Sequence, residues 1–358
     1  MTAINIHNTW KDQISELRED ENKARVKIFT WFLVGIVLSK SVHLSHIANK
    51  IPGDAQKTSV ERRLSRLLDN SQIRVREWYE PVARMILNAI ASMGGEVRLL
   101  VDGSKIGTGH QLLMIAVAYR KRSIPIAWTW VRCRRGHSSA HKQCALLAYV
   151  RKLMPPDASV VVVGDSEFGA MPVMRQLKQW KWSYVLRHKG DTLVFHPELR
   201  TWVRFDSLVK EAGESCWFKS VSFTQKHSFP TNILAYWMPG EETPWLLTTN
   251  LDCPKQTLRT YKIRMWIEEM FGDFKGHGFD LEATRLRHFM RLSRLTLVVA
   301  LAYVWLVAFG SSVIKRGLRY LVDRSDRRDL SIFRIGYDMF ERRMTNQQPI
   351  TIRLLPYF

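Results

Sequence analysis

Cysteine is scarce in this sequence of 358 residues. Four are present, no two of them form a CxxC pair, and they are Cys133, Cys144, Cys216 and Cys253. This number and spacing exclude a small secreted scaffold held by disulfides and favour a reducing compartment. The N-terminus also lacks the apolar stretch of a secretory signal, because charged residues interrupt it at Lys11, Asp12 and Glu16. We therefore expect a cytoplasmic protein.

Long apolar runs are also few. The best membrane candidate is residues 295–310, an uninterrupted run that is short for a bilayer span of about 20 residues. Two arginines precede this run, Arg291 and Arg294, and they suit the core helix of a nucleic-acid enzyme better. We expect no membrane partner.

Acidic residues are outnumbered by basic ones. The chain has 33 Asp and Glu against 54 Lys and Arg, with a formal charge of +21 and a pI near 10.1, which predicts attraction to a polyanion. Residues 1–90 carry +4, residues 91–254 carry +8 and residues 255–358 carry +9, as a long DNA footprint requires. The densest cluster without acids is Arg285, Arg287, Arg291 and Arg294, for which a solvated helix face is the alternative.

Residues 261–275 carry the most informative pattern. Tyr261, Arg264, Glu268 and Lys275 stand at i, i+3, i+7 and i+14, which at about 100° per residue places them on one stripe of an α-helix. This combination predicts a site for phosphate and metal, and an amphipathic surface helix is the alternative. Glu269 would point about 100° away from the stripe, so Glu268 is the candidate.

Two aspartates follow apolar runs of strand type. Asp102 comes after residues 97–101 and before Gly103-Ser104, which we interpret as a turn, and Asp165 comes after residues 159–164. Carboxylates buried together cost several kcal/mol unless a cation or proton neutralises them. Two divalent ions are the usual remedy when the substrate is a phosphodiester, with Asp102, Asp165 and Glu268 as ligands. A turn or N-cap role is the alternative for either aspartate, and Glu167 is a candidate for indirect support of the site.

The four-residue pattern carries a family resemblance. It matches, at every position, the Y-x2-R-x3-E-x6-K signature of bacterial insertion-sequence transposases of the DDE class, the insertion-sequence-four-like YREK group. Asp102 and Asp165 stand in the order that this group shows, and the chain resembles it over about residues 95–310. The resemblance implies that Asp102, Asp165 and Glu268 form the catalytic triad and bind two Mg²⁺ ions, for which Mn²⁺ substitutes. It also implies that Tyr261, Arg264 and Lys275 contact DNA phosphates near the scissile bond.

The resemblance further implies an α/β fold. Its ribonuclease-H-like core would be a mixed five-stranded sheet with helices on both faces, interrupted by a β-rich insertion and preceded by an all-α domain. Alternation of strands and helices from the first aspartate onward agrees with this fold class. The expected segments are residues 1–92 (DNA-end binding), 93–189 (core), 190–250 (insertion), 251–312 (core with the glutamate helix) and 313–358 (a basic C-terminal segment).

Within the N-terminal segment, residues 44–51, the breaker Pro52-Gly53 and residues 59–68 have a helix, turn, helix order. Arg62, Arg63 and Arg66 would lie near one side of the second helix, as a DNA-reading helix requires. The turn is longer than in the tight motif, and a plain helical bundle is the alternative.

By the resemblance, this is a homodimeric DNA transposase, associated with the bacterial nucleoid when bound to DNA. It would nick double-stranded DNA at transposon ends and use the released 3′-hydroxyl for the next attack, on the opposite strand to give a hairpin or on target DNA. In hairpin-forming relatives a tryptophan strand stacks on a flipped base, and Trp245 is the candidate here. Trp237 competes with it, and a core position is the alternative for Trp245. A catalytically silent or domesticated DNA-binding relative and a nuclease without strand transfer also stay open.

A further group has the spacing of a compact zinc site, namely Cys133, His137, His141 and Cys144. The surrounding segment is basic and polar and can instead face DNA. Structural zinc is the less favoured interpretation.

Overall fold

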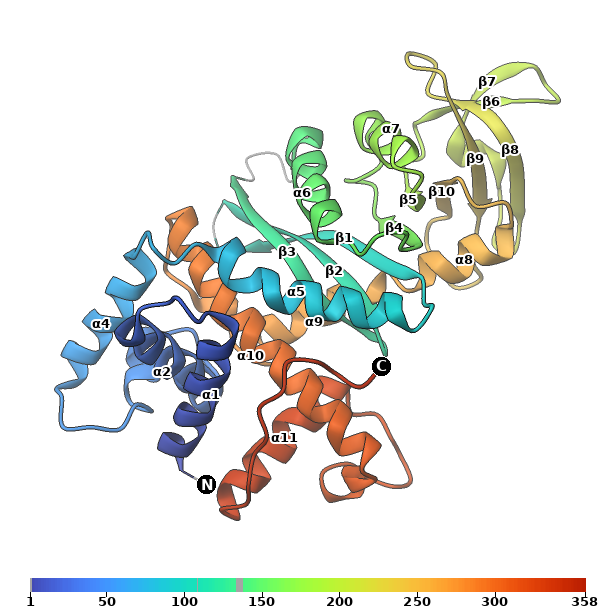
Figure 1. The fold of residues 1–358 in the computed structure, drawn as a ribbon. Helices are drawn as coiled ribbons and strands as arrows, with labels where there is room; N and C mark the ends of the chain where they lie inside the picture. Colours follow the sequence, from blue (N-terminus) through green and yellow to red (C-terminus); the bar gives the residue numbers. More distant parts are fainter. Residues whose placement is uncertain (1, 108, 133–137) are drawn as a thin grey trace.

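The computed structural model of the chain describes residues 2–107, 109–132 and 138–358. Five helices cover the first part of the chain (Figure 1): α1 (Ala3–Leu17), α2 (Lys23–Ser39), α3 (Leu44–Ala48), α4 (Lys57–Asp69) and α5 (Val75–Ser92). Asn22 begins α2 as an N-cap, since its side chain accepts hydrogen bonds from the amides of Ala24 and Arg25. The expected helix, turn, helix order is present in α3 and α4, and residues 49–56 connect them without the tight turn of the DNA-binding motif.

A mixed sheet of ten strands forms the centre of the fold, in the order β3-β2-β1-β4-β5-β10-β9-β8-β6-β7. β1 is antiparallel to β2 and parallel to β4, which is parallel to β5. The strands are β1 (Val97–Ile106), β2 (His110–Tyr119), β3 (Arg122–Arg132), β4 (Val160–Gly164), β5 (Ser183–Arg187), β6 (Leu193–His196), β7 (Thr201–Arg204), β8 (Ser215–Phe223), β9 (Phe229–Tyr236) and β10 (Trp245–Thr249).

The sheet is larger than the five strands expected from the sequence. Its sixth strand, β10, lies antiparallel to β5, so the strands of residues 193–249 extend the same sheet (Figure 1). Leu246, Leu247, Thr248 and Thr249 are all buried. A strand covered on both faces must pair on both sides to satisfy its backbone groups, and β10 does so between β5 and β9.

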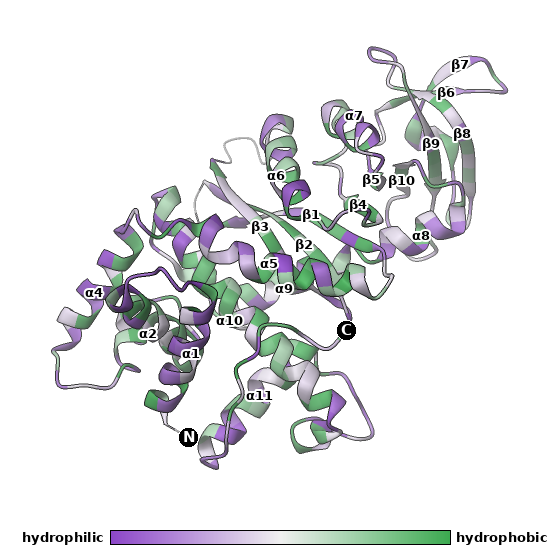
Figure 2. Cartoon of the chain, in the orientation of Figure 1, coloured by the Kyte–Doolittle hydropathy of each residue, from purple (hydrophilic) through white to green (hydrophobic). Residues whose placement is uncertain are grey.

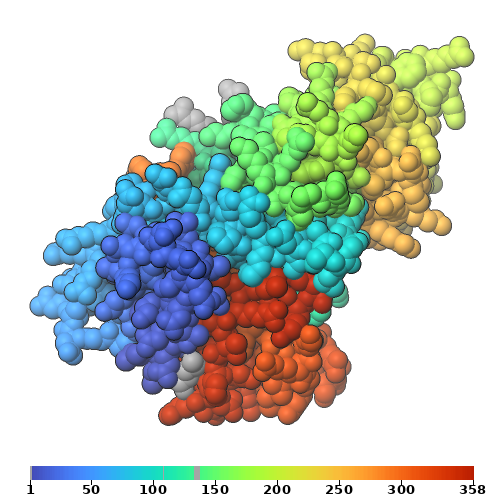
Figure 3. Space-filling view, in the orientation of Figure 1, coloured from blue at the N-terminus to red at the C-terminus, as the bar shows by residue number. Residues whose placement is uncertain are grey.

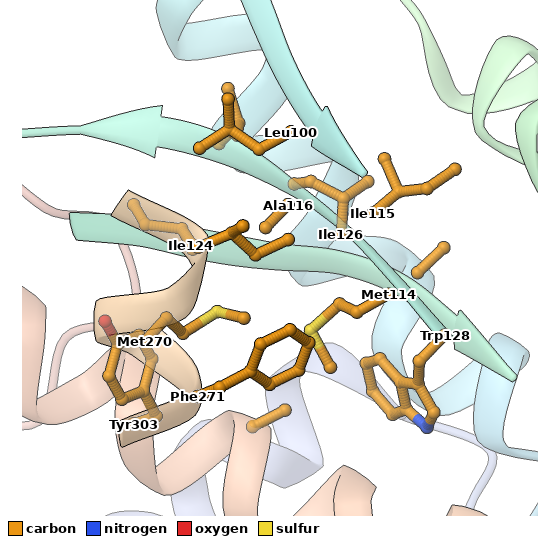
Figure 4. Packing of buried hydrophobic residues seen from close by; sticks show 14 of the residues in the cluster. Leu100, Met114, Ile115, Ala116, Ile124, Ile126, Trp128, Met270, Phe271 and Tyr303 are labelled. Carbon is orange, nitrogen blue, oxygen red and sulfur yellow. The ribbon is translucent and has the colours of Figure 1, made fainter. Parts of the chain in front are cut away.

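The remaining helices surround the first strands: α6 (Ala140–Leu153), α7 (Met171–Gln179), α8 (Pro254–Lys262), α9 (Met265–Phe274), α10 (Phe289–Lys315) and α11 (Ile332–Thr345), with short 3₁₀ turns η1 (Phe205–Leu208), η2 (Leu281–Ala283) and η3 (Leu318–Leu321). Figure 4 shows Met270 and Phe271 of α9 and Tyr303 of α10 packed beside Met114, Ile124 and Trp128 of the sheet. These contacts fix α9 against β1–β3. Strands and core helices are accordingly the most apolar elements in Figure 2.

Helix α10 is long and apolar enough to cross a membrane by length and composition, and 89% of its most apolar window is buried inside the fold. It contacts β3, α2, α4, α5 and α11, so it connects the N-terminal helices with the sheet. This agrees with the core helix expected from residues 295–310.

Helices α10 and α11 cross at two glycines. A Cβ on Gly310 would lie 2.0 Å from the carbonyl oxygen of Ile332, and one on Gly336 would lie 2.0 Å from that of Leu306. The backbones therefore approach as closely as only glycine allows. Tyr337 of α11 also donates a 2.6 Å hydrogen bond to the carbonyl of Val37 in α2. Residues from both ends of the chain consequently lie side by side in Figure 3.

Candidate active site

The two aspartates lie on neighbouring parallel strands. Asp165 directly follows β4, and Asp102 is one residue beyond the Val101–Gly164 pair where the parallel register of β1 with β4 ends. The interpretation of Gly103-Ser104 as a turn is wrong, because β1 continues to Ile106 along its antiparallel partner β2. Asp102 is thus at the end of the parallel ladder and in the middle of the strand.

Asp102 is buried, with 8% of its surface exposed. Burial, and then the charge of Asp165, raise the pKa of Asp102 from 3.8 to about 7, against the opposing hydrogen bond from the Gly103 amide to its Oδ1. The charge of Asp165 is therefore close enough to disfavour ionisation of Asp102. A cation between them would remove that cost.

The predicted helix over residues 261–275 is interrupted. α8 ends at Lys262 and α9 begins at Met265, because the amides of Arg264 and Trp266 bond to carbonyls three residues back rather than four. The prediction of one continuous helix that carries all four residues on a single stripe is therefore wrong. Tyr261 and Arg264 nevertheless stay one turn apart, and Glu268 follows in the first turn of α9.

Arg264 connects the glutamate to the buried aspartate. Its guanidinium lies 2.5 Å from Glu268 Oε1 and 3.8 Å from Asp102 Oδ2. Glu269 points elsewhere, to Arg122 of β3 at 2.9 Å, which supports the choice of Glu268. In this arrangement no three His, Cys, Asp or Glu side chains within the described ranges are grouped closely enough to hold a metal ion.

The residues present nevertheless fit a divalent cation. Asp102, Asp165 and Glu268 supply only hard carboxylate oxygens, which magnesium prefers. The raised pKa of Asp102 shows that this position disfavours uncompensated negative charge. Glu268 would have to leave Arg264 to become a ligand.

Tyr261 and Trp245 come together beside these carboxylates. Their rings meet edge to face at 5.1 Å, and Trp245 also contacts Tyr236. Tyr261 is buried, and burial raises the pKa of its phenol against the lowering effect of Arg264 and Arg187. Trp237 is half-buried and donates from Nε1 to the carbonyl of Glu241. Of the two tryptophans, Trp245 is the one that touches a signature residue.

Lys275 differs from its three signature partners. It ends α9, and its ammonium lies 2.7 Å from Glu282 Oε1. Lys275 is seven positions after Glu268, or about 10 Å along the helix axis. It pairs with η2, and the structure does not bring it to the carboxylates.

A cavity of about 490 Å³ lies beside the site. Asp165, Arg264 and Glu268 line one part, and Arg187 and Lys189, which the sequence reasoning missed, line another. Arg187 ends β5 and donates to Thr243 Oγ1 and the carbonyl of Pro244. The signal was available: basic residues at the carboxyl end of the strand parallel to the Asp165 strand must face the same edge of the sheet.

The arginines considered in the sequence analysis, the DNA-contact candidates and the other members of the arginine cluster, divide into two kinds. Arg62, Arg63 and Arg66 are exposed on α4, and Arg285 and Arg287 are exposed before α10. By contrast, Arg294 is buried and donates to the carbonyls of Leu68 and Ile73, and Arg291 binds Ser65 and Asp69. The last two members of the arginine cluster therefore hold α10 to the end of α4.

Part of the basic C-terminal segment pairs locally. Three arginines of residues 319–327 pair with aspartates two or four residues on: Arg319 with Asp323, Arg324 with Asp326 and Arg327 with Asp329. Residues 313–358 contain ten Lys and Arg against five Asp and Glu, so the segment keeps a net charge of +5.

The zinc candidate falls partly outside the described residues, where Cys133 and His137 lie. Of the other two, His141 is exposed and Cys144 is half-buried. Burial raises the pKa of the Cys144 thiol, which disfavours the thiolate that zinc requires.

Asp273 gives α9 a pH-dependent anchor. Its carboxylate accepts a 2.9 Å hydrogen bond from Arg122, and burial raises its pKa to about 7. Because this pKa lies above the value in the unfolded chain, protonated Asp273 stabilises the folded state. This contribution to the unfolding free energy is complete below about pH 4 and is lost as the pH rises through 7. We expect the unfolding free energy of the natural protein to fall by roughly 2 kcal/mol more than that of Asp273→Asn between pH 5 and pH 8. Denaturant titrations at both pH values measure this, and parallel profiles would contradict it.

The chain matches a known protein family. Residues 94–305 match the family described as "Transposase DDE domain". The match covers more than half of the chain and contains both aspartates and the glutamate, so the chain belongs to the DDE transposase family.

Among solved structures, the chain is similar to the piggyBac transposase in a cryo-EM synaptic complex with hairpin DNA. Identity is 14% and the TM-score is 0.44, with 98% of this chain and 83% of that chain covered. No curated protein matches the chain.

Proposed function

We propose that this chain binds the ends of a mobile DNA element and catalyses metal-dependent cleavage and strand transfer, as a YREK-group transposase. The observation that carries the proposal is that Arg264 pairs with both Asp102 and Glu268, while the charge of Asp165 acts on Asp102, inside the DDE family match. Three carboxylates from separate elements thus lie around one buried, charge-perturbed position, which is typical of functional sites.

The core is proposed to be ribonuclease-H-like. Support comes from strands β3-β2-β1-β4-β5, in which β1–β3 form an antiparallel meander and β4 and β5 run parallel to β1. Crossover helices α6 and α7 connect the parallel strands. The aspartates lie at the carboxyl end of the parallel ladder between β1 and β4, where α/β sheets place their ligands.

Asp102, Asp165 and Glu268 would hold two Mg²⁺ ions, with Mn²⁺ as a substitute. When bound, such ions activate water and stabilise the charge on the attacking and leaving oxygens of a phosphodiester. Arg264, released from Glu268, is then available for a bidentate contact with a DNA phosphate. Tyr261, beside Arg264, would contact the same DNA backbone. Lys275 would have to leave Glu282 before it could contact a DNA phosphate.

The proposed reaction begins with hydrolysis at the element end, which frees a 3′-hydroxyl. That hydroxyl attacks the opposite strand, which forms a hairpin and releases the flanking DNA. Hydrolysis of the hairpin by a second water frees the 3′-hydroxyl again, and its attack on target DNA, with displacement of a target 3′-oxygen, completes transfer. Two ends must be cut together, so a homodimer is the proposed working state. Exposed arginines on α4 (Arg62, Arg63 and Arg66), with Arg285 and Arg287, supply cationic contacts for the flanking duplex.

Trp245 is proposed to stack on a base flipped from the duplex during hairpin formation. We expect Trp245→Ala to spare the first nick and to lower hairpin yield about tenfold or more, because stacking contributes about 1 to 3 kcal/mol per base. Trp237→Ala is the matched comparison, since Trp237 directly follows β9 of the same sheet, and the ring contact with Tyr261 belongs to Trp245. Resolution of nicked and hairpin products on denaturing gels gives the result. An unchanged hairpin yield in Trp245→Ala removes the stacking role.

The proposed function is tested with purified protein, magnesium and labelled duplex taken from the DNA that flanks the gene. Cleavage followed by joining of pre-cut ends to a target plasmid is the expected result. Cleavage without joining would instead identify a nuclease, and binding without cleavage in either magnesium or manganese would identify a DNA-binding relative.

A further inference from the structure

A buried glutamine lies on β2, the strand that neighbours the Asp102 strand on the side opposite β4. Gln111 of β2 is 2% exposed and pairs in register with Lys105 of β1. Its side chain reaches diagonally over Gly103, where a Cβ would lie 2.1 Å from the glutamine Nε2. Only a residue without a side chain at position 103 leaves room for this amide, directly after Asp102.

The amide makes one strong contact, to Glu167. Gln111 Nε2 donates to Glu167 Oε2 at 2.9 Å. The backbone amide of Ser138 donates to Oε1 of the same carboxylate at 2.6 Å, and the Ser138 hydroxyl also donates to Oε1. The backbone amide of Glu167 in turn donates to Asp165 Oδ1 at 2.9 Å. A continuous path therefore runs from the loop of Asp165, through Glu167 and Gln111, to the backbone next to Asp102.

The orientation of the amide is determined by its partner. A reversed amide would place the glutamine oxygen against the Glu167 carboxylate, so Nε2 must face it. Gln111 Oε1 then has no donor among the residues that the structure describes. A buried acceptor without a donor destabilises the fold. If stability were the sole requirement at position 111, an apolar residue would be favoured over glutamine.

We propose that Gln111 is a positioning residue, which acts through Glu167 to hold the Asp102 and Asp165 carboxylates at the separation that a divalent ion requires. This inference rests on the proposed function. Groups that orient metal ligands from behind commonly change metal affinity by 10-fold to 100-fold when they are replaced. Gln111 meets that description for the aspartate pair.

The test measures Mn²⁺ binding to the full chain without DNA, by electron paramagnetic resonance of the free ion. We expect Gln111→Met, which keeps the side-chain volume and removes the donor, to weaken Mn²⁺ affinity by about tenfold or more. Gln143→Met is the matched control. Gln143 is equally buried, and its Oε1 also has no donor among the described residues. It donates to Ser138 and the Glu167 carbonyl, so it supports Glu167 as well, but the atoms nearest to Gly103, beside Asp102, belong to Gln111. We expect it to change affinity by less than about threefold.

A swapped pair separates positioning from simple packing. In Gln111→Glu combined with Glu167→Gln, the hydrogen bond keeps its length and the net charge is unchanged, with the donor now at position 167. We expect this variant to regain affinity within about threefold of the natural protein. If Gln111→Met does not fold, Gln111→Asn withdraws the donor by one methylene and replaces it in the series.

Equal losses in Gln111→Met and Gln143→Met, or no loss in either, would overturn the inference, and so would a natural protein that binds no Mn²⁺. A natural protein that binds Mn²⁺ with the expected differences and cleaves no DNA would remove the proposed function and leave Gln111 as the residue that positions the aspartates.

Discussion

Glu268→Gln is expected to abolish metal-dependent DNA cleavage while DNA binding stays within about twofold of the natural protein. Glutamine has the shape of glutamate and keeps the first turn of α9, but it lacks the negative charge that a hard cation requires. A loss of at least about a thousandfold in rate is expected, equivalent to ~4 kcal/mol in the activation free energy. Single-turnover cleavage and a binding isotherm on the same duplex measure the two properties separately.

The neighbouring carboxylate provides the control. Glu269→Gln carries the same chemical change one position along, where the side chain pairs with Arg122 on the sheet side of α9. We expect its cleavage rate to stay within about threefold of the natural protein, because half-exposed ion pairs contribute less than about 1 kcal/mol. Normal cleavage by Glu268→Gln would show that the assignment of Glu268 is wrong.

Gly336→Ala is expected to cause the largest loss of stability. The added Cβ would lie 2.0 Å from the carbonyl oxygen of Leu306 in α10, and a backbone atom within a helix cannot rotate away. Overpacking typically costs about 1 to 3 kcal/mol, and we expect the upper end or more here because two helices must separate. Thermal unfolding measures the change, with an expected decrease in Tm of about 5 °C or more.

The matched control is Gly276→Ala. No atom lies within 4 Å of a Cβ at Gly276, and its backbone does not have a positive φ. We therefore expect its Tm to stay within about 1 °C of the natural value. Similar values of Tm for the two variants would show that α10 and α11 can separate at little cost.

Features that depend on local sequence were predicted well. The apolar run of residues 159–164 predicted a strand before Asp165, and β4 ends directly before it. Asp102 and Asp165 were expected near each other because each follows an apolar run of strand type, and they lie on neighbouring parallel strands. Arg264 and Glu268 were selected because both fall on the predicted helical stripe, and they form an ion pair.

Features that depend on contacts with other elements could not be predicted from the sequence. Gly103-Ser104 has the composition of a turn, yet β2 extends the ladder past it. Lys275 was placed by helical spacing alone, but it follows the end of α9 and pairs with Glu282 of η2. Arg294 has the sequence signature of a surface cation, and its burial follows from the carbonyls that α4 presents at its C-terminal end. In each case a contact with a neighbouring element determined the outcome.

The pairing of β10 with β5 fixes the distance between the Trp245 strand and the Asp165 strand. Trp245 begins a strand that lies two positions from β4, and neighbouring strands are about 4.8 Å apart, so the tryptophan strand is held roughly 10 Å from the strand that presents Asp165. That span depends on ladder hydrogen bonds and is independent of how many residues lie between β5 and β10. The segment from β6 to β9 can therefore vary in length and shape among relatives without altering the distance between the aromatic ring and the acidic edge.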